Sequence, residues 1–305
     1  MINPIYRAQV QLLLRILPYI AEEKDLALKG GTAINMFIWD MPRLSVDLDL
    51  TYIKFDQRNI ALANISAAIN RIKDRFTKAL PGIRLETRGS SEDYEEKLIC
   101  WYQGVQVKIE VNTIMRGIIR PTHILPITKA VQKEFNLFAE MNIVSNAEIF
   151  GGKICAALDR QHPRDLFDIN YLLENSGINK EIKQGFIAAL LSHPRSIHEM
   201  LRPNFHDQQE VFYNQFYGMT TTKFSYFDFE FTRRNLLEIV HNMLNEQDKN
   251  FLLSFKSAIP KWDLTDIKGL SELPAIKWKL LNIQKLAQEN PKRHADFVQK
   301  LKDCF

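Results

Sequence analysis

Two aspartates separated by a single residue lie in the alternating stretch SVDLDLTYI, a pattern typical of a β-strand. Side chains alternate across a strand, so Asp47 and Asp49 project from the face opposite Val46, Leu48 and Leu50. Mg²⁺ prefers oxygen ligands and usually bridges one or two carboxylates to substrate phosphates. The spacing therefore predicts a divalent metal site on one face of this strand.

A glycine pair precedes the aspartates, and Asp47 follows Gly31 by 16 residues. Gly30 and Gly31 fall between the apolar strand-like stretch LALK and the helix-like stretch TAINMFIW. Glycines let backbone N–H groups approach a phosphate closely, and a helix N-terminus adds a favourable dipole. The hydroxyl of Thr32 can donate a further hydrogen bond. We therefore expect a triphosphate to bind at the turn formed by residues 30–32.

A third carboxylate, Glu110, lies on the second arm of KLICWYQGVQVKIEVNTI, a stretch with a turn at Gln103-Gly104. On a strand next to the aspartates, Glu110 would complete a two-metal site with ions roughly 4 Å apart. Each feature alone has an ordinary explanation, because glycine pairs are usually turns and alternating aspartates are usually solvated. Their order along the chain favours a catalytic site.

The stretch LKGGTAINMFIWDMPRLSVDLDLTY resembles the AbiEii family of bacterial nucleotidyltransferases. These are the toxins of type IV toxin–antitoxin systems; they are related to the MenT toxins and belong to the DNA polymerase β-like superfamily. The resemblance implies a small mixed sheet, with Gly30 and Gly31 at the nucleoside triphosphate and Asp47 and Asp49 as ligands of Mg²⁺ or Mn²⁺. The family's usual run before the carboxylates, also expected near the nucleotide, is matched here by Arg43 and Ser45.

A second stretch, NAEIFGGKICAALDRQHPRDLFDINYLLE, resembles later motifs of the same family through Lys153, Arg160, Arg164, Asp165 and Asp168. The resemblance implies that Lys153 stabilises triphosphate charge, while Asp165 orients this lysine or assists proton removal. The spacing also fits an ordinary salt-bridged helix pair, because Lys153 and Arg160 lie two turns apart on one helical face. Both explanations remain open at this point.

The surrounding pattern predicts an α+β chain in two parts. Residues 1–120 would form a polymerase β-like nucleotidyltransferase core, with helices at 7–24 and 58–80 and a further strand at IRLETR. Residues 121–305, after a linker marked by two prolines, would form a mostly helical domain that contributes Lys153 and Asp165 to the site. Its expected helices are 145–160, 164–175, 179–192, 233–247 and 277–304, and the Phe- and Tyr-rich residues 204–231 would form a hairpin.

Composition limits the class of protein. The 305 residues are 46% hydrophobic and carry a formal net charge of +4, which is ordinary for a globular protein. The three cysteines are far apart, so a disulfide framework or a zinc site is not expected. No stretch approaches the roughly 20 apolar residues that span a bilayer, and no signal peptide is recognisable. We expect a cytoplasmic monomer without a membrane partner.

Basic residues gather in two places. Residues 111–133 contain no acidic residue, and the last 29 residues carry seven Lys and Arg against three Asp and Glu. The basic residues of the first stretch are Arg116, Arg120, Lys129 and Lys133. Surfaces of this kind suit a phosphate-bearing partner.

Together these features predict a Mg²⁺-dependent nucleotidyltransferase toxin that transfers a nucleoside monophosphate from an NTP to an RNA acceptor. In related toxins that acceptor is the 3′ end of tRNA, and the modification would block translation. A cognate antitoxin is the expected partner. Two alternatives stay open, namely nucleotidylation of a protein hydroxyl and a non-catalytic nucleotide- or RNA-binding module.

Overall fold

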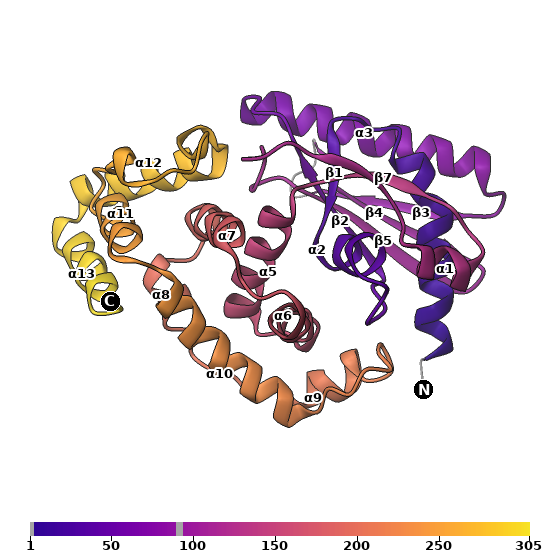
Figure 1. Ribbon diagram of the computed structural model, residues 1–305. Helices are drawn as coiled ribbons and strands as arrows, with labels where there is room; N and C mark the ends of the chain where they lie inside the picture. Colours follow the sequence, from indigo (N-terminus) through magenta and orange to yellow (C-terminus); the bar gives the residue numbers. More distant parts are fainter. Residues whose placement is uncertain (1–2, 90–93) are drawn as a thin grey trace. The chain divides into compact units, whose positions relative to one another are not determined.

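The computed structural model describes residues 3–89 and 94–305, and this described chain divides into two compact units (Figure 1). The first unit is Met1–Ser145 with Gln215–Lys223, and the second is Asn146–Asn214 with Phe224–Phe305. Within residues 3–89 and 94–305, no helix is long and apolar enough to cross a bilayer.

The first unit is built on a mixed sheet which, in the described residues, has seven strands in the order β3-β4-β5-β2-β1-β7-β6. β1 pairs antiparallel with β2 and parallel with β7, while β2 pairs parallel with β5. The remaining neighbours are antiparallel. The elements are α1 (Pro4–Ile20), β1 (Leu26–Lys29), α2 (Gly30–Ala33), η1 (Ile34–Ile38), β2 (Asp47–Tyr52), α3 (Arg58–Ala79), β3 (Arg84–Arg88), β4 (Lys97–Tyr102), β5 (Val105–Asn112), β6 (His123–Pro126), α4 (Lys129–Phe135) and β7 (Glu140–Ile143).

The elements predicted around the glycine pair and the aspartates are confirmed. LALK forms β1, the aspartates lie on β2, and the KLICWYQGVQVKIEVNTI stretch forms the β4–β5 hairpin. The predicted mixed α+β class is therefore correct. Alternation decides which face is buried, because Leu48 and Leu50 are 0% exposed while Asp47 and Asp49 are partly exposed.

The stretch read as a linker after residue 120 forms part of the first unit instead. It contains β6, α4 and β7, and β7 joins the sheet beside β1 through the pairing of Leu28 with Ile143. The predicted boundary at residue 120 therefore lies inside this unit, and the chain passes to the second unit after Ser145. Short strands of four residues give too little alternation to be recognised without their partner strand.

The second unit is helical. Its elements are α5 (Asn146–Arg160), α6 (Pro163–Asn175), α7 (Lys180–Ser192), α8 (Ile197–Leu201), α9 (Gln209–Val211), α10 (Tyr226–Met243), α11 (Glu246–Lys256), η3 (Trp262–Leu264), η4 (Leu270–Glu272), α12 (Pro274–Glu289) and α13 (Pro291–Lys302), and the π-helical turn η2 (Phe212–Phe216) spans the border between the units. The predicted helix 277–304 is two helices. Pro291 lacks a backbone N–H and starts α13, whose first turn Asn290 caps by accepting from the amide of Arg293 at 3.0 Å.

The hairpin predicted for residues 204–231 is wrong. This segment forms α9, η2 and the beginning of α10, and in the second unit the rings of Phe212, Phe224 and Phe229 pack together. A capping box starts α10, because Ser225 and Asp228 each accept a hydrogen bond from the other's amide. The aromatic composition of this segment favoured strands. The capping box instead starts a helix, and composition alone does not reveal such a cap.

Residues 215–223 return to the first unit and cover the chain just before β2. The amide of Leu44 donates to Met219 O at 2.7 Å, and the hydroxyl of Thr220 donates to Pro42 O at 2.6 Å. Residues distant in sequence therefore fix the approach to the predicted metal site.

Two glycines bring α5 and α7 into close contact within the second unit. A Cβ added at Gly151 would lie 2.2 Å from the carbonyl carbon of Gly185, and one added at Gly185 would lie 1.9 Å from Ala147 O. Real Cβ atoms cannot approach backbone so closely, so the contact requires glycine at both positions. Gly152, the next residue on α5, has nothing within 4 Å of an added Cβ.

This contact gives a matched pair of variants. Gly151→Ala should lower the free energy of unfolding by roughly 2–3 kcal/mol, because the extra methyl must push two packed helices apart. Gly152→Ala should leave it unchanged or raise it by up to about 1 kcal/mol, because alanine favours a helix and meets no neighbour. Urea unfolding of the two variants measures the difference, and equal stabilities would contradict this packing.

Candidate active site

The register of four strands places a row of charged residues across one face of the sheet. Lys29 on β1 lies opposite Asp49 on β2, Asp49 lies beside Glu110 on β5, and Glu110 lies opposite Lys97 on β4. Residues paired in this way point to the same face of a sheet. Asp47 stands two residues before Asp49 and so shares this face. The three carboxylates predicted from the sequence are thus neighbours on one surface.

Lys108 lies among these carboxylates. It is the β5 partner of Asp47, and its Nζ is 3.0 Å from a carboxylate oxygen of Glu110. Burial disfavours its charged form, but Glu110, Asp47 and Asp49 together hold the pKa of Lys108 above its ordinary value. Sequence alternation placed Lys108 on the face of Glu110, but only the β2–β5 register shows that it accompanies the aspartates.

Glu110 is engaged by two lysines, since Lys97 Nζ lies 3.2 Å from its other oxygen. Burial opposes its ionisation, yet Lys108 and Lys97 keep the pKa of Glu110 below the usual range. Glu110 therefore balances lysine charge in this structure. Its predicted role as a third metal ligand stays a prediction.

Gly30 makes the closest approach to the aspartates. Its φ of +71° is a left-handed conformation that favours glycine. A Cβ at this position would lie 2.7 Å from Asp49 Oδ2. The absence of a side chain at Gly30 thus lets the carboxylate of Asp49, a predicted metal ligand, lie directly against the backbone of the turn.

The other residues expected at the nucleotide form a buried network behind this turn. The hydroxyl of Thr32 donates to Asp47 O at 2.5 Å and lies 3.0 Å from the hydroxyl of Ser45. A Cβ at Gly31 would lie 2.7 Å from a guanidinium nitrogen of Arg43. Thr32, Arg43 and Ser45 are all buried. This arrangement positions the backbone of Asp47. Thr32 donates its single hydroxyl proton to a partner within the protein.

Asn35 completes the network and was not singled out from the sequence. Its side chain donates to Gly31 O at 2.9 Å and accepts from the amide of Arg43 at 3.3 Å. Asn35 is 0% exposed and lies in the π-helical turn η1, which continues α2. A buried polar side chain inside an apolar helical stretch was the available signal.

The donor set of Asp47 and Asp49 fits a divalent cation. Both are carboxylates on one partly exposed face, and Asp49 lies against the backbone of the glycine turn. Among the residues that the structure describes, no three His, Cys, Asp or Glu side chains are gathered as metal ligands. The carboxylate pair would therefore share a cation with groups of the substrate.

The second predicted cluster lies within the second unit, where α5 meets α6. Lys153 Nζ contacts Asp165 Oδ1 at 2.8 Å and Asp168 Oδ2 at 3.1 Å, and all three side chains are buried. Arg160, which is largely exposed, donates from Nε to Asp165 Oδ2 at 2.5 Å. Burial raises the pKa of Asp165, but Lys153 and Arg160 outweigh it and hold this pKa well below the usual range. A role of this cluster in nucleotide transfer stays a prediction.

The basic surface expected at the C-terminus is partly buried. Lys279 donates to the carbonyls of Leu190, His193 and Arg195 at 2.8–3.1 Å. Burial and the nearby Lys256 lower the pKa of Lys279 to about 7. Lys279 therefore closes the C-terminal end of α7 and is not available to RNA, whereas Lys277 and Lys285 are exposed and pair only with exposed glutamates.

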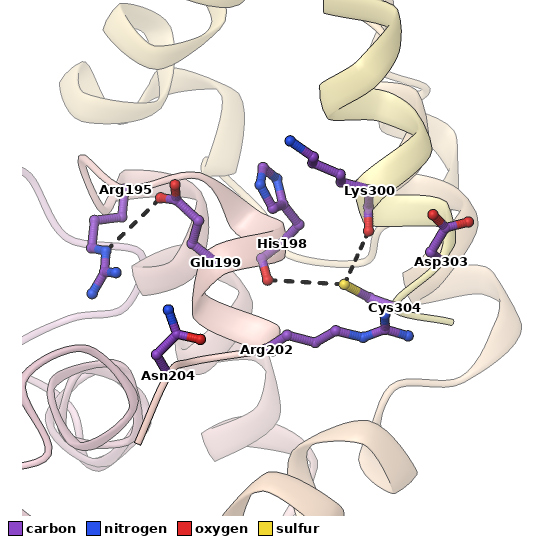
Figure 2. Close-up of a pocket in the computed structure, with 8 residues that line it drawn as sticks. All are labelled: Arg195, His198, Glu199, Arg202, Asn204, Lys300, Asp303 and Cys304. Atoms are coloured by element: carbon purple, nitrogen blue, oxygen red, sulfur yellow. Dashed lines mark hydrogen bonds and ion pairs between the residues drawn. The ribbon is translucent and has the colours of Figure 1, made fainter. Parts of the chain in front are cut away.

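A polar pocket of about 250 Å³ lies elsewhere in the second unit, and none of the predicted catalytic, nucleotide-binding or metal-binding residues lines it, although Lys300 of the basic C-terminal stretch does (Figure 2). Two of its cations lie beside acids, because Arg195 contacts Asp159 at 2.8 Å and Lys300 contacts Asp296 at 2.9 Å. Glu199 and Asp303 also line the pocket, so it presents acidic as well as basic groups.

The structure places the chain among proteins with a nucleotidyltransferase fold. It is similar to that of MenT4, a nucleotidyltransferase toxin from Mycobacterium tuberculosis H37Rv, with a TM-score of 0.58. The alignment covers 91% of this chain and 93% of MenT4, at 15% sequence identity. Identity at this level shows the shared fold. A search of curated proteins found no match.

Residues 11–280 match the model of the family described as "Nucleotidyl transferase AbiEii toxin, Type IV TA system". The match spans most of the chain, so this protein belongs to that family. It is therefore a nucleotidyltransferase toxin, and the family implies an NTP substrate and an antitoxin partner.

The buried cluster of α5 and α6 gives a prediction about stability. Lys153→Met should lower the free energy of unfolding at pH 7 by about 3 kcal/mol, because two buried carboxylates lose their shared cation. The folded pKa of Asp165 is depressed, so its contribution is present above the unfolded value of 3.8 and is lost as pH falls below it. The difference from wild type should therefore shrink below about pH 4.

Urea unfolding at neutral and acidic pH measures this effect. Lys180→Met is the control, because Lys180 and its partner Asp266 are largely exposed, and this variant should change stability little. A Lys153→Met variant as stable as the control at pH 7 would show that the buried ion pair contributes nothing to the fold.

Proposed function

We propose that this toxin uses Mg²⁺, or Mn²⁺ in its place, to transfer a nucleoside monophosphate from an NTP to the 3′ end of an RNA acceptor. The acceptor that we propose is tRNA, whose modification would stop translation in the cytoplasm. The observation that carries the proposal is the pair Asp47 and Asp49 on one face of β2, with Gly30 beside Asp49.

Different residues of the chain would bind the cation and hold the surrounding backbone in place. Asp47 and Asp49 would hold the cation, and the carboxylate of Asp49 lies against the backbone of the turn at Gly30. When bound, the cation supplies Lewis-acid stabilisation of phosphoryl charge. Thr32, Ser45 and Asn35 hold the backbone of this turn and of Asp47 in place. Lys108 adds positive charge to the same face.

RNA as the acceptor is supported by the distribution of basic residues. The stretch 111–133 has no acidic residue, and Lys277 and Lys285 are exposed near the C-terminus. Contacts to RNA phosphates release counterions, so binding through these residues should weaken steeply with salt.

Incubation with labelled NTPs and total RNA, with and without Mg²⁺, tests the proposal. We expect label in RNA of tRNA size, only when Mg²⁺ is present. The same reactions are separated for protein, because label on a polypeptide would instead establish a protein acceptor. If neither the RNA nor the protein fraction is labelled with any of the four NTPs, the protein would be a binding module without transferase activity.

Asp47→Asn and Asp49→Asn should each reduce transfer by roughly a hundredfold or more, because an amide is a poor ligand for a hard cation. Thermal unfolding should change little, since both side chains are partly exposed. Asp74→Asn on α3, an exposed aspartate of the same unit, is the control. Substantial transfer by either active-site variant would refute the assignment of the metal ligands.

A further inference from the structure

Arg116 is a buried cation without a matching anion. It is 6% exposed, and its Nε is buried without a hydrogen-bond partner. The described chain offers its guanidinium one hydrogen bond, a long one of 3.4 Å from Nη1 to the backbone oxygen of Asp56, and no carboxylate pairs with it. A buried charge is costly unless paired, so a guanidinium held in this way is suited to an anionic ligand.

The loop that carries Arg116 is fixed by hydrogen bonds on both sides. The hydroxyl of Thr51 donates to Met115 O at 2.9 Å, and the amide of Gly117 donates to Tyr52 O at 2.9 Å. The side chain of Asn112 accepts from the amides of Ile114 and Met115 at 3.0 and 2.8 Å. Arg116 is therefore held in place by its neighbours before any ligand arrives.

The side chain of Arg116 reaches the N-terminus of α3, a helix of 22 residues. No side chain caps this helix, and its first turn contains no acidic residue. The exposed residue Arg58 begins the helix, and it adds to burial in lowering the pKa of Arg116. Free amides at a helix N-terminus, a buried guanidinium and a second arginine all favour negative charge.

The carboxylate of Asp56 does not fill this role. It accepts hydrogen bonds from the hydroxyl of Tyr52 and from the side chain of Asn64. Its charge favours the charged form of Arg116 only from a distance, because no ion pair forms between Asp56 and Arg116. Among the described residues no anion pairs with Arg116, which leaves its guanidinium suited to an anion supplied by a ligand.

We propose that Arg116, Arg58 and the first turn of α3 bind a phosphate group, and that this group belongs to the backbone of a single-stranded RNA. Phosphate suits a guanidinium and helix amides together. Three apolar side chains close by in sequence, Phe55, Ile60 and Ile114, are each about half exposed. An exposed aromatic ring next to a phosphate site offers a stacking surface for a base. The choice of RNA rests on the proposed acceptor, whereas the phosphate site does not.

The test uses the full chain without NTP or added metal, so that a failure of nucleotide transfer cannot affect it. Inorganic phosphate should raise the melting temperature of the wild type above that in sodium chloride of equal ionic strength. Arg116→Met should remove this rise yet melt no lower than wild type in its absence, because the substitution also removes an unpaired buried charge. Arg58→Gln should weaken the rise, and Arg84→Gln, an exposed arginine on β3 stacked on Trp101, should not.

A fluorescent single-stranded RNA distinguishes the two sources of phosphate. Arg116→Met and Arg58→Gln should each weaken its binding by about tenfold, as expected for a lost charge-assisted contact. Phe55→Ala should weaken RNA binding while leaving the response to inorganic phosphate unchanged. A response to phosphate alone, with RNA binding unaffected by all three variants, would overturn the assignment to RNA. If Arg116→Met melts lower and keeps the phosphate response, Arg116 is structural and the site does not exist.

Discussion

The parallel pairing of β2 with β5 is the constraint on which the candidate site depends. This register sets Asp47 beside Lys108 and Asp49 beside Glu110. Two negative side chains on β2 therefore lie next to one positive and one negative side chain on β5. A shift by one residue would turn every carboxylate toward the apolar side, where Leu48 and Ile109 are fully buried. Burial of the apolar face therefore fixes the position of the charged face. The chemistry of the site is a consequence of the packing of the core beneath it.

The charge on this face also limits how a cation could bind. Lys108 lies close enough to Asp47, Asp49 and Glu110 for all three to favour its charged form. A divalent ion bound by the aspartates would weaken this stabilisation, because it repels the ammonium group. Glu110 contacts both Lys97 and Lys108, and so neutralises part of their charge. Three carboxylates and two lysines thus share the surface on which Asp47 and Asp49 are the predicted metal ligands.

The sequence alone was sufficient where local rules decide the structure. Alternation identified β2 and the β4–β5 hairpin, and the glycine pair marked the turn whose φ of +71° requires Gly30. It was insufficient where partners are distant. β7 forms a strand because it pairs with β1. Residues 215–223 cannot be assigned to the first unit from their own composition. The same holds for side chains: nothing near Lys279 in the sequence shows that three carbonyls surround it.

Three buried cations show how differently the fold treats charge. Lys153 contacts two buried carboxylates, and Arg160 supplies a second cation to one of them, Asp165. Lys279 has only carbonyl dipoles, and its pKa falls to about 7, so near neutral pH it can shed its proton instead of bearing an unmatched charge. Arginine cannot lose its proton in this way, because a guanidinium stays protonated at any physiological pH even when burial lowers its pKa. Arg116 therefore keeps its charge without a partner in the described chain, and a stable fold tolerates this only at a cost. An anion that binds there would recover that cost, which is why an unpaired arginine indicates a ligand more strongly than an unpaired lysine does.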